Sequence, residues 1–166
     1  MKQFKGKLLN VSAKKTVLPN GHKLTLEIVE HPGAVLIVPF VSKDKVIMLR
    51  QYRAVIDTYM YEFPAGTLGK EEKHSHCAYR ELIEETGYKA KRIKNIGMIY
   101  PCPGYSTERI VFFTAHELTA CLHRPEPDEI IEIKVMSRKE VQKLFSSGKI
   151  VDAKTICALA MCGITR

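Results

Sequence analysis

The segment Arg80-Glu81-Leu82-Ile83-Glu84-Glu85 gathers carboxylates in a way that local stability does not explain. In a helix, Glu81, Glu84 and Glu85 share one face, because residues three and four apart are neighbours. Like charges at that spacing repel one another by about a few tenths of a kcal/mol. Gly87 marks the end of the helix, where the dipole disfavours a carboxylate by roughly 0.3–1 kcal/mol. Such a conflict with local rules is typical of a functional site.

A hard divalent cation would resolve this conflict. Mg²⁺ takes oxygen ligands and binds in proteins through a few carboxylates together with substrate phosphates. These residues alone leave one alternative open, which is an ordinary acidic helix face exposed to solvent.

The spacing upstream of the helix favours the metal site. Five residues separate Gly66 from Glu72, and seven separate Glu72 from Arg80. After Arg80-Glu81, an apolar residue and one free position precede Glu84-Glu85, and Gly87-Tyr88 follow after one more. This pattern resembles the signature of the Nudix hydrolase family, G-x5-E-x7-R-E-U-x-E-E-x-G-U, in which U is a bulky apolar residue. Tyr88 departs only mildly from the last position.

The resemblance implies an α/β (α+β) fold: the Nudix fold, with a mixed β-sheet sandwiched between helices and a loop–helix–loop metal site. Carried over residue by residue, it makes Glu81 and Glu85 ligands of Mg²⁺, for which Mn²⁺ could substitute. Glu84 would be a further ligand, and the carbonyl of Ala65 would complete the shell.

Residues near these ligands are expected to position them or to take part in catalysis. Arg80 belongs with the catalytic group and is expected to pair with Glu72 or with the glutamates, and so to hold the loop on the helix. A second acidic stretch, Glu126 to Glu132, precedes a strand. By resemblance, Glu129 supplies a further metal ligand or the base that activates water, with Glu132 as the alternative.

Segments outside the signature are similar to the ADP-ribose pyrophosphatase branch of the family. They are residues 31–35, 49–53, 62–66 and 101–109, and Pro103 stands about sixteen residues past Gly87. The implied reaction is Mg²⁺-dependent hydrolysis of a nucleoside diphosphate sugar, with ADP-ribose giving AMP and ribose 5-phosphate. Neighbouring branches share much of this pattern, so GDP-mannose, another nucleotide sugar or a dinucleoside polyphosphate stay open as substrates.

The diphosphate needs a cation, and Arg53 can bind it through two parallel hydrogen bonds. Strand alternation puts Arg53 and Gln51 on one face and Arg50, the competing choice, on the other. Glu62 and Glu108 could accept hydrogen bonds from ribose hydroxyls. The predicted substrate-binding set is Arg53, Gln51, Glu62, Leu68, Cys102, Pro103 and Glu108.

Hydrophobic patterning predicts the elements that position these residues. Strands are expected at residues 5–11, 22–29, 34–41, 46–51, 59–63, 90–100, 110–118 and 130–136, helices at 73–86, 138–146 and 153–162, and a loop at 65–70. Residues 1–30 would form a small N-terminal β region, which by resemblance exchanges between the subunits of a homodimer. Residues 31–166 would form the Nudix hydrolase domain.

Composition and charge indicate the class of protein and its compartment. The net charge is +8, but Lys and Arg are spread along the chain, so a nucleic-acid-binding module is a minor alternative. The longest apolar run, residues 34–41, is too short to span a bilayer. Five cysteines, an odd number without C-x-x-C spacing, indicate reduced thiols and a cytoplasmic protein.

Overall fold

The computed structural model describes residues 4–122 and 129–165, which form two β-sheets and three helices. The strands are β1 (Phe4–Lys5), β2 (Asn10–Val17), β3 (Lys23–Glu30), β4 (Ala34–Ser42), β5 (Lys45–Arg53), β6 (Thr58–Glu62), β7 (Ala65–Thr67), β8 (Tyr88–Ile99), β9 (Ile110–Ala120) and β10 (Ile131–Ser137). The helices are α1 (His74–Thr86), α2 (Arg138–Ser146) and α3 (Ala153–Met161).

The larger sheet is mixed, as the sequence predicts. Its main path runs β10-β5-β4-β9-β8, with β6 added to β5 and β7 added to β4. Strands β4 and β9 pair in parallel, and the other pairs are antiparallel. The apolar run of β4 occupies the centre, where both faces of a sheet are covered.

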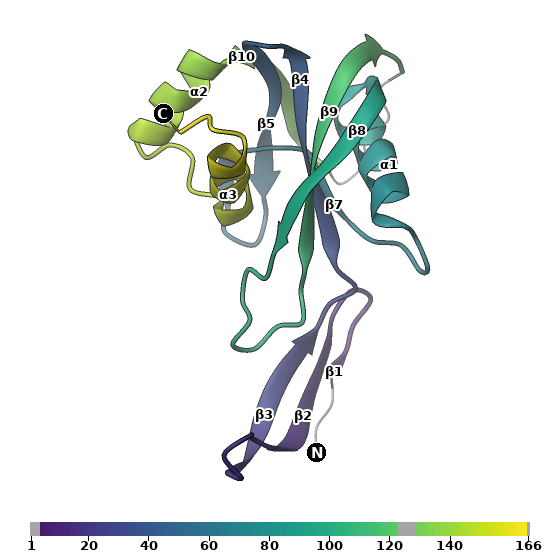
Figure 1. Ribbon diagram of the computed structural model, residues 1–166, viewed down its shortest axis with the longest axis vertical. Helices are drawn as coiled ribbons and strands as arrows, with labels where there is room; N and C mark the ends of the chain where they lie inside the picture. Colours follow the sequence, from purple (N-terminus) through teal and green to yellow (C-terminus); the bar gives the residue numbers. More distant parts are fainter. Residues whose placement is uncertain (1–3, 123–128, 166) are drawn as a thin grey trace.

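Helices cover both faces of this sheet, with α1 on one side and α2 and α3 on the other (Figure 1). Alternation along β4 supplies both cores, since Val35 and Ile37 pack in the cluster with α1. Leu36 and Val38 belong to the cluster that includes residues of α2 and α3. The prediction of a sheet sandwiched between helices is therefore confirmed.

Helix α1 is built to place carboxylates at the edge of the core. Cys77, Ala78 and Leu82 are fully buried against the sheet. The helix ends where Gly87 adopts φ 67°, and its N–H donates to the carbonyl of Ile83 at 2.9 Å. This left-handed cap is the conformation that favours glycine at a helix end.

The smaller sheet holds β1, β2 and β3 and extends from the body of the molecule (Figure 1). A continuous strand over residues 5–11 was expected, and this is wrong: the chain turns between β1 and β2, where Gly6 N–H donates to the Leu9 carbonyl at 2.8 Å. The turn lets Phe4 pair with Val11 in an antiparallel hairpin.

The loop expected at residues 65–70 also needs correction. Ala65–Thr67 forms the short strand β7, because its backbone pairs with residues 34–36 of β4. Such a partner lies far away in sequence and cannot be read from local pattern. The pairing holds the first glycine of the signature directly beside α1.

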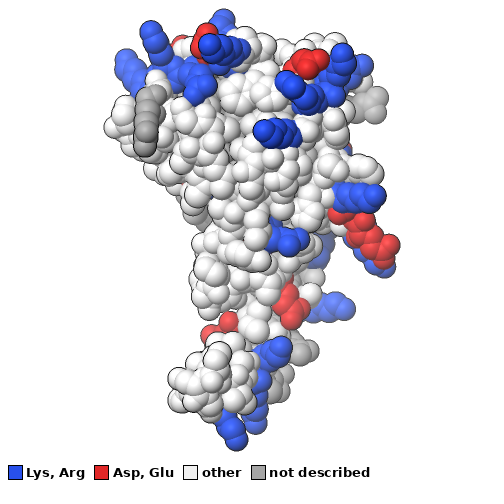
Figure 2. All heavy atoms as spheres, in the orientation of Figure 1, with Lys and Arg blue, Asp and Glu red and all other residues white. Residues whose placement is uncertain are grey.

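The surface agrees with the dispersed charge of the sequence. On the face shown in Figure 2, Lys and Arg lie at both ends of the molecule and along one side, with acidic residues between them. Among the described residues, none of the helices has the length and apolar character needed to cross a membrane.

Candidate active site

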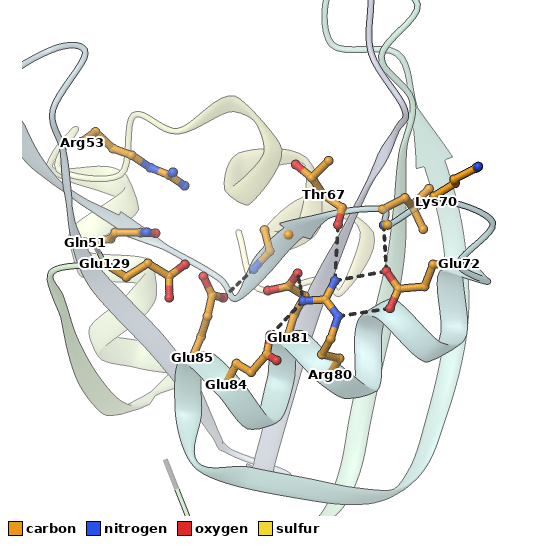
Figure 3. A pocket seen from close by; sticks show the side chains of 14 residues that line it. Gln51, Arg53, Thr67, Lys70, Glu72, Arg80, Glu81, Glu84, Glu85 and Glu129 are labelled. Carbon is orange, nitrogen blue, oxygen red and sulfur yellow. Dashed lines mark hydrogen bonds and ion pairs between the residues drawn. The ribbon is translucent and has the colours of Figure 1, made fainter. Parts of the chain in front are cut away.

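A cavity of about 820 Å³ opens between α1, β7 and the end of β5. It brings together Gln51, Arg53, Ala65, Gly66, Thr67, Leu68, Gly69, Lys70, Glu72, Arg80, Glu81, Glu84, Glu85 and Glu129 (Figure 3). Most of the residues assigned from the sequence to metal or substrate therefore share one space. Five of the fourteen lining residues are glutamates, so the cavity is strongly acidic although the protein is basic.

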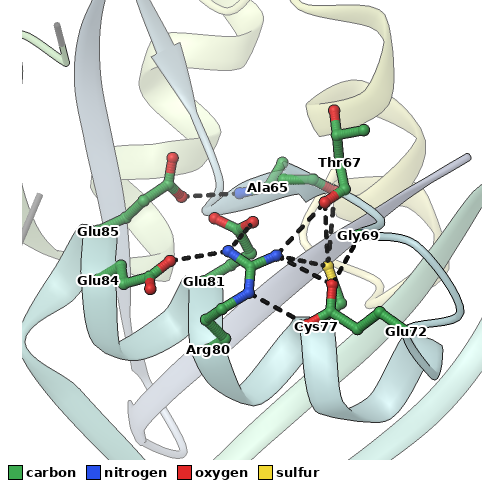
Figure 4. A network of polar contacts seen from close by, with 10 residues as sticks. Ala65, Thr67, Gly69, Glu72, Cys77, Arg80, Glu81, Glu84 and Glu85 are labelled. Carbon is green, nitrogen blue, oxygen red and sulfur yellow. Dashed lines mark hydrogen bonds and ion pairs between the residues drawn. The ribbon is translucent and has the colours of Figure 1, made fainter. Parts of the chain in front are cut away.

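Arg80 lies at the centre of what we call the glutamate cluster, formed with Glu72, Glu81, Glu84 and Glu85 (Figure 4). Its Nε and Nη2 donate to Glu72 at 3.1 Å each, and its Nη1 contacts Glu81 at 2.7 Å and Glu84 at 2.8 Å. These contacts hold down the pKa of Glu72, to about 2. Glu72 also accepts from Gly69 N–H, so the expected fastening of loop to helix is present.

Glu81 and Glu85 are buried carboxylates with too little positive charge around them. Burial raises the pKa of Glu81 to about 7, against the opposing effect of Arg80. Burial likewise raises the pKa of Glu85 well above its usual range, against the N–H of Ala65, which donates to Glu85 at 2.9 Å. Three of the four carboxylates contact the one guanidinium and the fourth, Glu85, contacts a backbone N–H, so this cluster has more carboxylates than cations.

Gly66 fits closely against Glu81. A Cβ at this position would stand 1.9 Å from the carboxyl carbon of Glu81, far inside van der Waals contact. The glycine is therefore needed for close approach of β7 to the carboxylate, and not for an unusual backbone conformation.

This donor set fits a hard divalent cation. Glu81, Glu85 and Ala65 all line the cavity, where the two carboxylates and the backbone carbonyl could supply oxygen ligands, and the carboxylates supply negative charge. Within the described residues, no three such side chains stand together as a ready-made metal cluster. The guanidinium of Arg80 contacts one carboxylate oxygen of Glu81 and one of Glu84.

A second ionic group, which we call the Glu62 cluster, borders the same cavity. It consists of Arg53, Glu62, Asp152 and Lys154. Arg53 donates from Nε to Glu62 at 2.7 Å and from Nη2 at 2.6 Å, and Lys154 contacts both Glu62 and Asp152. Burial alone would raise the pKa of Glu62, but Arg53 and Lys154 outweigh it and lower that pKa.

The Glu62 cluster bears on the predicted contact of Glu62 with ribose. Its side chain is 1% exposed and does not line the cavity. Both carboxylate oxygens already accept hydrogen bonds from Arg53, so Glu62 lies behind the cavity wall, and its predicted contact with ribose stays a prediction.

Strand alternation on β5 is confirmed. Gln51 and Arg53 line the cavity, whereas Arg50 faces away, paired with Glu132 at 2.5 Å and lying over the ring of Tyr59. Glu132 is thereby separated from the cavity, and Glu129 lies in its wall. Residues 126–128 of the same acidic stretch fall outside the described residues.

Three residues of the predicted substrate-binding set lie elsewhere. Cys102, Pro103 and Glu108 are on the loop between β8 and β9, beside the N-terminal sheet and not in the cavity wall (Figure 1). This loop is joined to β3, where Val29 N–H donates to the Tyr105 carbonyl at 2.8 Å. Their role in binding stays a prediction.

Sequence reasoning missed three residues of this region. Lys70 and Thr67 line the cavity, and Lys154 lies behind it on α3. The signature leaves residues 67 and 70 unspecified, so it carried no signal for them. Asp152 could have been recognised as the N-cap of α3, but its contact with Lys154 and that lysine's contact with Glu62 depend on tertiary structure.

Comparison with known proteins defines the class. The NUDIX domain model matches residues 30–159. The chain is 37% identical over 158 residues to the ADP-ribose pyrophosphatase of Bacillus subtilis, covering 94% of this chain and 85% of the relative. This chain belongs to the NUDIX family and is a Nudix hydrolase.

Two further proteins are similar. A GDP-mannose pyrophosphatase of Salmonella typhimurium is 32% identical over 136 residues, covering 76% of this chain and 71% of the relative. A crystal structure of an ADP compounds hydrolase superposes with a TM-score of 0.82, covering 96% of this chain and 86% of that one at 22% identity. At that identity the structural match bears on the fold alone.

Proposed function

We propose that this enzyme hydrolyses the diphosphate bond of a nucleoside diphosphate sugar, with Mg²⁺ as cofactor and ADP-ribose as the preferred substrate. The observation that carries the proposal is the cavity in which Glu81, Glu84, Glu85 and Glu129 face Gln51 and Arg53. The similarity to a bacterial ADP-ribose pyrophosphatase over nearly the whole chain supports the choice of substrate.

The proposed roles follow from charge and position. Glu81, Glu85 and the Ala65 carbonyl would hold Mg²⁺ (or Mn²⁺), joined by Glu84 and Glu129. A bound ion supplies neutralisation of the diphosphate charge. Arg53 binds and orients the diphosphate from the opposite wall, and Arg80 keeps α1 and the loop before it in register. Glu129 or Glu84 accepts the proton of the attacking water.

The products would be AMP and ribose 5-phosphate. A second candidate substrate is GDP-mannose, favoured by the similarity to a GDP-mannose pyrophosphatase over three quarters of the chain. The two candidates share the diphosphate and differ in base and sugar, so the same cleavage machinery would serve both.

A substrate panel tests the proposal. The enzyme is assayed with ADP-ribose, GDP-mannose and a diadenosine polyphosphate, with and without Mg²⁺, and the products are identified by mass spectrometry. We expect Mg²⁺-dependent AMP release and the highest kcat/KM with ADP-ribose. A higher kcat/KM for GDP-mannose would replace the substrate, and no Mg²⁺-dependent cleavage of any compound would refute the proposal.

We also propose a cytoplasmic homodimer with two regions per chain, residues 1–30 and 31–166. The N-terminal sheet supports an interface because it exposes large apolar side chains, among them Phe4 at 63% and Val17 at 61%. Five free cysteines suit a reducing compartment. Light scattering should give twice the chain mass, with Phe4→Glu/Val17→Glu shifting the protein toward monomer; a wild-type monomer would contradict the interface.

A further inference from the structure

Lys154 is a largely buried cation that the proposed reaction does not use. It lies in the first turn of α3, far in sequence from the signature, and its side chain is only 18% exposed. Its ammonium contacts Oε2 of Glu62 and lies 2.9 Å from Oδ1 of Asp152. Burying an ammonium is costly unless it is paired, so this placement calls for an explanation.

The start of α3 is fixed against the end of β6. Asp152 caps the helix by accepting from Thr155 N–H at 2.9 Å. The hydroxyl of Thr155, itself fully buried, accepts from Phe63 N–H at 3.1 Å, directly after Glu62. These two hydrogen bonds therefore fix the position of Lys154 relative to Glu62.

Glu62 transmits this contact to Arg53. The carboxylate engages the Nε and Nη2 edge of the guanidinium, which fixes the plane of the group and leaves the Nη1 edge turned away from Glu62. Arg53 lines the cavity, and Figure 3 shows its guanidinium directed toward the cavity interior. The orientation of Arg53, the proposed diphosphate-binding residue, thus depends on the Glu62 carboxylate, which Lys154 contacts in turn.

Lys154 also affects the net charge of the Glu62 cluster. Arg53 and Lys154 balance Glu62 and Asp152, so the cluster is close to neutral. Without Lys154, the negative charge of Glu62 would fall on Arg53 alone, and the wall facing an anionic substrate would gain one net negative charge. A substrate carrying a diphosphate would then bind less well.

We propose that Lys154 is a positioning residue for substrate binding: acting through Glu62, it sets the orientation and the effective charge of Arg53 toward the diphosphate. The inference rests on the proposed function, because it needs Arg53 to contact the substrate. It adds to the site a residue of the C-terminal helix that lies outside the Nudix signature.

Steady-state kinetics of the full-length enzyme test this. Lys154→Met removes the charge and keeps the chain length, and Lys154→Arg restores the charge. We expect Lys154→Met to raise KM about tenfold with kcat within roughly twofold, and Lys154→Arg to return KM toward the wild-type value. The exposed lysine variant Lys149→Met is the matched control and should leave both constants unchanged.

The outcomes separate the inference from the proposed function. Wild-type KM in Lys154→Met, or a loss confined to kcat that Lys154→Arg does not rescue, overturns the inference while the activity stands. Lys154→Gln keeps a hydrogen-bond donor without charge; failure of both uncharged variants to fold would make the lysine a stability residue and also overturn it. No Mg²⁺-dependent hydrolysis by the wild type refutes the proposed function itself.

Discussion

The glutamate cluster and the Glu62 cluster border the same cavity and use the same side-chain chemistry, yet their charge balance differs. In the first, the single guanidinium of Arg80 contacts three carboxylates, and a fourth, Glu85, accepts from a backbone N–H. The second sets two carboxylates against two cations. In the first cluster, burial raises the pKa of Glu81 and Glu85, and these carboxylates favour a bound cation. In the second, the charges balance, and the buried carboxylate of Glu62 supports Arg53.

The largest effect should come from the glutamate cluster. We expect Glu85→Gln to lower turnover by more than roughly a hundredfold, since even residues beside metal ligands are worth 10–100-fold. Stability should be equal or higher, because the amide can still accept from Ala65 N–H and no longer buries a charge. Kinetics and thermal melting check both parts, and wild-type turnover would break the assignment of the metal site.

Substitution in the Glu62 cluster should instead lower the stability of the fold. Glu62→Ala leaves two cations without their shared partner and should destabilise the fold by about 2 kcal/mol, below the range for a fully buried pair because Arg53 is 39% exposed. Glu132→Ala, which removes an ion pair whose glutamate is 43% exposed, is the matched control and should lower stability clearly less than Glu62→Ala. Equal costs in urea unfolding would contradict the distinction.

Gly66→Ala tests whether the position of a carboxylate matters apart from its charge. The added Cβ must displace Glu81, whose carboxyl carbon would lie 1.9 Å away. A shift of this kind should lower kcat/KM about tenfold, while the melting temperature changes little because the end of a side chain can move. Activity within twofold of wild type would show that Glu81 tolerates displacement.

The smallest effect concerns Glu72 and acid pH. Arg80 lowers the pKa of Glu72 from 4.5 to about 2, so its contribution to stability is present above pH 4.5 and is lost as pH falls toward about 2. Glu72→Gln lacks this contribution at every pH. The difference in melting temperature between wild type and variant should therefore shrink from pH 6 to pH 2; a constant difference would argue against the pair.

Local patterns predicted α1, its Gly87 cap and the helix at residues 138–146, because these depend on neighbours in sequence. Alternation on β5 likewise separated Arg53 from Arg50. What the sequence did not predict depends on partners that are distant along the chain. β7 forms because β4 is available to pair with it, and Glu62 turns into the interior because Arg53 and Lys154 meet it there.

The dual contact of Arg80 with Glu81 and Glu84 has a consequence for how the proposed metal ion would bind. The arginine serves as a resident counterion, so the fold should not require metal, and treatment with a chelator should abolish activity without lowering the melting temperature. An ion bound to Glu81 or Glu84 would share these carboxylates with the arginine, whose positive charge should weaken metal affinity in the free enzyme. A substrate that brings its own phosphate ligands would restore this affinity, so ion and substrate should bind cooperatively.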